Sequence, residues 1–198
     1  MKITDHQNAI IVGTLLGDGL LERNGKYVRL SIDHSIKQKE YLWWKYNELK
    51  TLVPSKPRII KSYHSREQKE YKRLHFATYS LDLFECHWDA FYTNSKKTIS
   101  NFINTWLRDP LSLAVWYMDD GSKRSDCNAL RISTDSFSLP EQKILQNVLK
   151  ENFDIMTTLH RKGKWWNLYI PQKEAKKFVE LVFPYIIPSL KYKIALTL

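Results

Sequence analysis

The stretch from Leu113 to Lys123 reads LAVWYMDDGSK, and its interpretation decides the fold of the whole chain. It begins with an apolar run and ends in Asp120-Gly121 before two polar residues. Because glycine directly after an apolar run commonly ends a helix, the stretch is predicted to be a buried helix with a carboxylate at its tip. One such occurrence would indicate only a helix end.

A second copy of the pattern lies 102 residues earlier, in IVGTLLGDG (residues 11–19). At this shift Asp18-Gly19 falls on Asp120-Gly121, and three polar positions also match without a gap. These are Arg29, Ser31 and Asp33, which fall on Arg131, Ser133 and Asp135. A shift that matches both a helix end and the strand after it predicts two homologous halves, residues 1–95 and 96–198.

Each half is expected to repeat the same order of helices and strands. The Asn24-Gly25 pair is a strong hairpin signal, and Val28, Leu30 and Ile32 alternate with polar residues, as in a half-buried strand. In the first half we expect helix 7–17, strands 20–23 and 26–33, helix 36–52, strands 58–63 and 73–79, and helix 81–92. In the second we expect helix 110–119, strand 129–135, helix 139–152, strands 156–161 and 165–170, and helix 172–184. The predicted fold class is therefore α/β, with two pseudo-symmetric αββαββα halves, each containing an antiparallel sheet.

The charge of the chain indicates the kind of partner. Thirty-one Lys and Arg against 21 Asp and Glu give a net charge of +10 in 198 residues. A basic surplus of this size favours a polyanion, most commonly nucleic acid. The two cysteines, Cys86 and Cys127, have no zinc-binding spacing and are expected to be reduced thiols.

No apolar run is long enough to cross a membrane, and no signal or transit segment is visible at the N-terminus. The expectation is an intracellular protein, in the compartment of the host genome, either an organelle or the bacterial cytoplasm, with no membrane partner.

The letters Tyr117-Met118-Asp119-Asp120 also match a box that carries two metal-binding carboxylates in reverse transcriptases. In those enzymes the box lies on a strand turn inside a palm, flanked by fingers and thumb. This chain is too short for those parts, and its other copy, residues 11–19, has no such box. A polymerase fragment therefore remains only as a residual interpretation.

The paired segments at residues 11–19 and 113–121 resemble the two signature helices of LAGLIDADG homing endonucleases. The resemblance extends over nearly the whole chain. KKTISNFINTWLRDPLSLAVWYMDDGSK (96–123) and IPSLKYK (187–193) are most similar to single-chain, intron-encoded members. It implies a DNA-binding saddle formed by the two sheets around two packed signature helices.

Small residues in the first motif support such packing. Gly13 and Gly17 are four residues apart, so they share a helix face that another backbone can approach closely. The second motif has Val115 and Asp119 at these places, which makes the seam asymmetric. Packing would bring Asp18 and Asp120 together, and two close carboxylates are best explained by a bound divalent cation. Asp119 is a rival carboxylate, but Asp120 precedes glycine as Asp18 does, so we expect Asp119 to be a supporting group.

The resemblance implies the catalytic groups. Asp18 and Asp120 would hold two or more Mg²⁺ ions, with the carbonyls of Gly17 and Asp119 as further ligands. The basic residue expected near each scissile phosphate maps to Lys97 and Lys193.

The polar faces of the strands are expected to contact DNA, since the major groove admits a β-ribbon. The predicted contact residues are Tyr27, Arg29, Ser31, Asp33, Arg58, Lys61, Arg73, His75, Arg131, Ser133, Asp135, Arg161, Lys164 and Asn167.

The predicted function is that of a monomeric, Mg²⁺-dependent endonuclease that cuts both strands of a long double-stranded DNA target and leaves 3′ overhangs. The alternative is an intron maturase of the same fold, whose partner is intron RNA and which need not cut DNA. Intact acids in both motifs favour the endonuclease, because an RNA-binding protein has no need of them.

Overall fold

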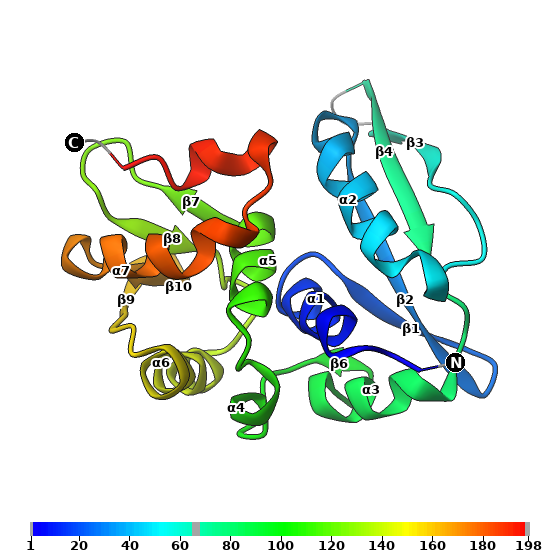
Figure 1. Cartoon of the computed structure of the whole chain (residues 1–198), viewed down its shortest axis with the longest axis horizontal. Coiled ribbons are helices and arrows are strands. Elements are labelled where there is room, and N and C mark those ends of the chain that lie inside the picture. Colours follow the sequence, from blue (N-terminus) through cyan, green and yellow to red (C-terminus); the bar gives the residue numbers. More distant parts are fainter. Residues whose placement is uncertain (1, 65–67, 197–198) are drawn as a thin grey trace.

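The computed structural model describes residues 2–64 and 68–196. Two helices lie side by side in the middle of the molecule, α1 (Asp5–Leu16) and α5 (Pro110–Asp120), with one sheet and its helices on each side (Figure 1). Thr4 and Gln7 form a capping box at the start of α1, and Asp109 with Pro110 begins α5. Both helices are apolar around most of their circumference, because each packs against its own half and against the other helix.

The first half contains a four-stranded antiparallel sheet in the order β1-β2-β4-β3. Its elements are β1 (Leu20–Asn24), β2 (Tyr27–Ser35), α2 (Lys39–Leu49), β3 (Arg58–His64), β4 (Lys69–Ala77) and α3 (Glu85–Phe91). A short hairpin of β5 (Tyr92–Thr93) and β6 (Lys96–Lys97) leads to α4 (Ile103–Trp106) and the second half.

The second half repeats the sheet in the order β7-β8-β10-β9. Its elements after α5 are β7 (Gly121–Lys123), β8 (Leu130–Ile132), α6 (Leu139–Phe153), β9 (Thr158–Lys162), β10 (Trp165–Ile170) and α7 (Gln172–Val182). A final 3-10 helix at Pro188–Lys193 runs back toward the end of α5. The α/β class with antiparallel sheets is thus confirmed.

Several element limits differ from the predicted ones for local reasons. The helix predicted at residues 36–52 is α2 with a 3-10 turn at each end, and the one at 81–92 begins with a 3-10 turn before α3. Strand β8 ends at Ile132 because the next two backbone N–H groups bond elsewhere. The Ser133 N–H donates to the Asp120 carbonyl and the Thr134 N–H to the Asn167 side chain.

The strand part of the repeat is offset by two residues from the ungapped match. Ser31 pairs with Leu20, two residues after Asp18, whereas Arg131 pairs with Ser122, two residues after Asp120. Ser31 and Arg131 therefore occupy equivalent places, and the ungapped pairing of Arg29 with Arg131 is wrong. Because the offset is even, each side chain still points to the predicted face of its sheet.

The glycines of α1 allow the close approach to α5. A Cβ at Gly13 would lie 2.3 Å from the Ser112 carbonyl oxygen, and one at Gly17 would lie 2.5 Å from the Asp119 Cβ. Neither position has room for a side chain, so the predicted roles of the two glycines in packing are confirmed.

Candidate active site at the ends of the two motif helices

Asp18 lies just beyond the end of α1, in a bend made by Gly17 and Gly19. The bend is fixed by two backbone bonds, from the Gly17 N–H to the Gly13 carbonyl at 3.2 Å and from the Gly19 N–H to the Thr14 carbonyl at 2.7 Å. The Asp18 side chain is 47% exposed. A ligand approaching the ends of the helices could therefore reach this carboxylate.

Asp120 is held differently, since it is the last residue of α5. Its carbonyl accepts the Ser133 N–H at 3.0 Å, which ties the helix end to the sheet of its own half. Its carboxyl is partly buried.

Two lysines bind the backbone beside these acids in matching ways. The Lys97 Nζ, on the β5–β6 hairpin, donates to the carbonyls of Gly17 at 3.0 Å and Gly19 at 2.7 Å. The Lys193 Nζ, at the end of the last 3-10 helix, donates to the carbonyls of Met118 at 2.6 Å and Asp119 at 3.1 Å. Each motif end thus receives one lysine from a distant segment, at the two positions that the sequence predicted.

Asp119 takes no part in this exposed group. Its side chain is fully buried, and the equally buried Lys45 of α2 donates to both of its oxygens, at 2.8 and 3.0 Å. Its Oδ2 also accepts the backbone N–H of Asp18 at 3.2 Å. Asp119 therefore links the second motif to the first half, which fits the expectation of a supporting group.

His34, on β2, lies beneath the same group. Its side chain is 1% exposed, with Nδ1 3.5 Å from Asp18 Oδ2 and Nε2 3.8 Å from Asp119 Oδ1. Among the described residues, the His34 Nε2 has no hydrogen-bond partner.

Neither His34 nor Lys45 was predicted as a site residue, although the sequence carried a signal for each. His34 continues the apolar alternation of Val28, Leu30 and Ile32, and Lys45 lies at helical spacing from Tyr41 and Leu49. A polar residue on an apolar face indicates a buried partner. The partner of Lys45, Asp119, comes from the other half, and His34 lies near both Asp18 and Asp119.

The electrostatics of the two motif acids differ. For Asp18, burial acts to raise the pKa, but His34, Lys45 and Lys193 together lower it below its usual value. For Asp120, burial and the charges of Asp119 and Asp18 raise the pKa to about 8, although both lysines oppose the shift. A carboxyl group whose pKa is raised by neighbouring carboxylates binds a proton or a cation, because either one relieves the repulsion between the negative charges.

These residues fit a divalent cation. Asp18, His34 and Asp119 each place a ligand atom within 4.8 Å of the others, but Lys45 already binds both oxygens of Asp119. The carboxyl groups open to a cation are therefore those of Asp18 and of Asp120, whose pKa is raised by burial and by its acidic neighbours. The carbonyls of Gly17 and Asp119 each have a second lone pair beyond the one that accepts a lysine. Oxygen donors of this kind are the ligands that Mg²⁺ prefers.

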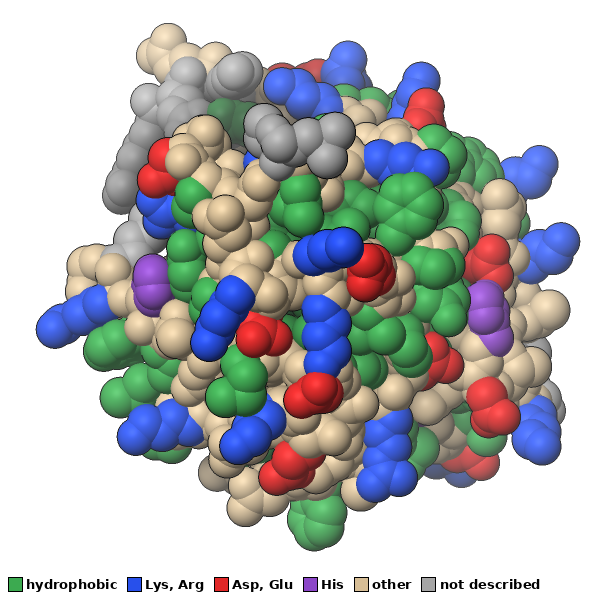
Figure 2. Space-filling model, turned by 60° about the vertical axis from the view of Figure 1, so that its left-hand side comes forward, with side chains coloured by type: hydrophobic (Ala, Val, Ile, Leu, Met, Phe, Trp, Pro, Cys, Tyr) green, Lys and Arg blue, Asp and Glu red, His purple; other side chains and the backbone are tan. Residues whose placement is uncertain are grey.

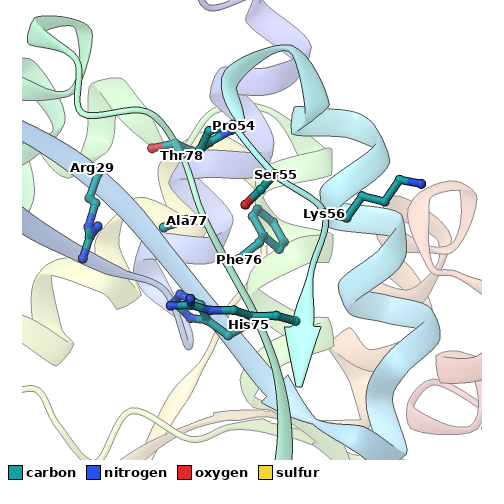
Figure 3. Close-up of a pocket in the computed structure, with 9 residues that line it drawn as sticks. Arg29, Pro54, Ser55, Lys56, His75, Phe76, Ala77 and Thr78 are labelled. Carbon is teal, nitrogen blue, oxygen red and sulfur yellow. The ribbon is translucent and has the colours of Figure 1, made fainter. Parts of the chain in front are cut away.

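The polar face of the first sheet carries most of the contact residues predicted in the first half. Asp33 on β2 and Arg58 on β3 both pair with His75 on β4, so the three side chains point to the same face of the sheet. Arg29 and His75 border a hollow over this face, whose lining also includes Arg58 and Lys56 (Figure 3). Asp33 forms an ion pair with Arg73 at 2.9 Å.

Lys61 does not belong to this face. It pairs with Lys72, two residues before the buried Leu74, so it points to the opposite side of the sheet, where Glu70 lies 3.5 Å from its Nζ. The expectation placed Lys61 on the same strand face as Arg58, but residues three apart on one strand point to opposite faces, and the register of β3 with β4 shows this for Lys61.

The second sheet has a smaller polar face than expected. Arg131, Arg161 and Asn167 border one hollow with residues that were not predicted, namely Arg124, His160 and Tyr169. Asn167 is 3% exposed and accepts the Thr134 N–H, so it braces the sheet rather than pointing freely outward. Arg161 pairs with Trp166, the neighbour of Asn167, so the register points it to the opposite face of the sheet. It lies near the tip of the β9–β10 hairpin and still borders the same hollow.

Beyond the end of β8, the predicted residues Asp135 and Lys164 border a separate hollow together with Trp165. The side chain of Lys164 lies over the Trp165 ring, 4.8 Å from its centroid. Ser133, also predicted, is half-buried next to Asp120, and Tyr27 is exposed on the outer end of β2. Asp135 and Lys164 thus border a different hollow from the one around Arg131.

The face shown in Figure 2 is mixed in charge, with Lys and Arg side chains interspersed among Asp and Glu. The net charge is thus not gathered into an unbroken basic patch on that face. Among the described residues, no helix is long and apolar enough to cross a membrane.

Comparison with known proteins settles the family. The model of the LAGLIDADG DNA endonuclease family matches residues 8–178, which include both motif helices and both sheets. The chain is a LAGLIDADG protein.

Two relatives of this LAGLIDADG chain have names that point to different functions. The DNA endonuclease I-ChuI of Chlamydomonas applanata is 32% identical over 212 residues, covering 98% of this chain and 97% of that protein. The cytochrome b mRNA maturase bI2 of Debaryomyces hansenii is also 32% identical, covering 93% of this chain and 72% of that protein.

Among solved structures, the homing endonuclease I-WcaI bound to its DNA recognition sequence superposes with a TM-score of 0.93 at 25% identity, covering all of this chain and 89% of that one. A variant structure of the homing endonuclease I-DmoI, with a TM-score of 0.57 and 16% identity, shares the fold.

Proposed function

We propose that this LAGLIDADG protein is a site-specific homing endonuclease that cuts both strands of a long double-stranded DNA target. One observation carries the proposal. The two motif helices end together, and each end carries an accessible or partly accessible acid beside a lysine bound to the neighbouring carbonyls. A protein that only binds nucleic acid needs no such pair of acids.

Asp18 and Asp120 would hold Mg²⁺, helped by the carbonyls of Gly17 and Asp119. When bound, the ions activate a water molecule and neutralise the negative charge of the phosphate and of the leaving oxygen. Lys97 and Lys193 would add positive charge near the two scissile phosphates. Both lysines are partly desolvated, which lowers their pKa despite the nearby acids and strengthens their interaction with a phosphate.

The two sheets would form a saddle on DNA, with residues 1–95 and 96–198 as the halves of one monomer. The proposed contacts are those predicted from the sequence apart from Lys61, with Arg124, His160 and Tyr169 added. Contacts to phosphate position a protein on DNA, and contacts to base edges give it specificity. Such an enzyme acts in the compartment that contains its target genome.

DNA affinity is expected to fall steeply with salt. If six to ten phosphates are neutralised, a plot of log K against log salt should have a slope of about −5 or steeper. Titrations of a cognate duplex between low and physiological salt measure it. A slope near zero would argue against a DNA saddle.

The function itself is tested by incubating the protein with a library of candidate sites and Mg²⁺, then sequencing the cut ends. We expect one site, or a few closely related sites, to be cut in both strands. No cutting of any library member, with I-ChuI cutting its own target in a parallel reaction as a positive control, would contradict the proposal.

A second candidate function is that of an intron maturase. The specific observation in its favour is the 32% identity to a cytochrome b mRNA maturase over most of this chain. It is tested by splicing of the intron that encodes the protein, with wild type and the Asp18→Asn variant. Equal stimulation of splicing by both proteins would establish a maturase activity that is independent of the acids. No stimulation by either would exclude it.

A further inference from the structure

The two motif acids are held by different parts of the molecule. Asp120 belongs to α5, and its carbonyl bonds to the Ser133 N–H of the same half. Asp18 lies beyond α1, whose carbonyls accept the N–H groups of Gly17 and Gly19 on either side of it. The Asp18 N–H bonds instead to the side chain of Asp119, from the other half.

Asp119 can accept this bond because its own position is fixed. Lys45 binds both carboxylate oxygens, and both side chains of the pair are fully buried. The Lys45 Nζ also lies 4.5 Å from the centroid of the Tyr41 ring, whose hydroxyl donates to the Val115 carbonyl on α5. Lys45 and Tyr41 thus fasten α2 of the first half to the second motif helix.

Among the described residues of the second half, 96–196, there is no matching arrangement for Asp120. Gly17 occupies the place in the first motif that Asp119 occupies in the second, and it has no side chain to reach across. The buried residues of α6, a helix that the structure describes completely, are Gln142, Leu145, Val148, Leu149 and Phe153, with no cation among them. The support from the opposite half is therefore one-sided.

The same asymmetry is present on the strands. Ser31 and Arg131 are equivalent in the ladders, and three residues further along come His34 and Thr134. His34 faces Asp18 and Asp119, whereas the Thr134 hydroxyl donates to Gln142 inside its own half.

We propose that each motif acid serves one DNA strand and that Asp119, held by Lys45, is a positioning residue for Asp18 across the interface between the halves, so that cutting of one strand depends on this pair and cutting of the other does not. The inference rests on the proposed endonuclease function. Asp119 acts here through its side chain, by fixing the backbone that carries the Asp18 carboxylate.

The test uses the double variant Lys45→Met/Asp119→Ala, which removes the pair without leaving a buried charge. Cutting of each strand is followed on a duplex labelled separately on its two strands. The rate on one strand should fall at least about tenfold, as for the loss of groups that orient metal-binding residues, and nicked DNA should accumulate. The rate on the other strand should stay within about threefold of wild type.

Two further variants distinguish a positioning role of Asp119 from a general loss of stability. Lys45→Met/Asp119→Asn keeps an oxygen at the acceptor position, again without a buried charge, and is expected to restore the affected strand in part. Gln7→Met removes buried bonds to Glu48 and Thr51 at the opposite end of α1, so it should lower stability without changing the ratio of the two strand rates.

An equal fall on both strands in the double variant, or an unchanged ratio, would overturn the inference. The result for Asp18→Asn separates this failure from a failure of the proposed function. If Asp18→Asn cuts both strands normally, the proposed active site is wrong. If Asp18→Asn is inactive while the double variant keeps the wild-type ratio, only the positioning role is wrong.

Discussion

Asp18→Asn and Asp120→Asn are each expected to abolish double-strand cutting while leaving binding to the target site within a few-fold of wild type. Asparagine keeps the volume of the side chain but lacks the negative charge that a divalent cation needs. Since even outer-shell changes at metal sites commonly cost 10–100-fold, the loss of a direct ligand should exceed about 100-fold. Linearisation of a plasmid carrying the site, with binding measured by gel shift in calcium, checks both parts.

Asp119→Asn is the matched control for these two variants. Asp119 is adjacent to Asp120 but is fully buried against Lys45, so its carboxylate is not available to DNA. We expect Asp119→Asn to retain far more double-strand cutting than either motif variant. If Asp119→Asn abolishes cutting and Asp120→Asn does not, the assignment of the second catalytic acid is wrong.

Lys45→Met is expected to destabilise the fold by about 3–5 kcal/mol, the usual cost of leaving one partner of a buried ion pair uncompensated. Asp119 would keep its charge at 0% exposure, and the Asp18 N–H that donates to it carries no compensating positive charge. Urea unfolding without DNA or metal measures the change in the free energy of unfolding.

The double variant Lys45→Met/Asp119→Ala should recover most of this loss, because replacing a whole buried pair by apolar groups is often neutral. The comparison therefore requires both single variants and the double variant. If Lys45→Met unfolds within about 1 kcal/mol of wild type, the buried pair does not stabilise the association of the halves.

The repeat in the sequence was sufficient to predict the architecture and both motif acids. The apolar runs that end in Asp-Gly located α1 and α5, and strand alternation located most strands within a few residues. The short strand β7 (Gly121–Lys123) was not predicted. Lys97 and Lys193 could be placed only through the family resemblance, since nothing in their immediate neighbours distinguishes them from the other basic residues.

What the sequence could not predict depends on contacts between distant segments. The two-residue offset between the halves arises in the hairpin ladders. Periodicity alone does not fix such a register. Lys45 was missed because it gains its partner, Asp119, only when the halves associate, and His34 because its neighbours Asp18 and Asp119 come from the ends of two different helices.

The central claim is that Asp18 and Asp120 form one composite site at the ends of the packed helices α1 and α5. Two acids that close to each other can reach opposite strands only across the minor groove, where facing phosphates are offset in the 3′ direction. Sequencing the ends of a plasmid linearised by this protein tests the claim most directly. Short 3′ overhangs with Mg²⁺, and intact plasmid with a chelator, are the predicted result, whereas blunt or 5′-extended ends would contradict it.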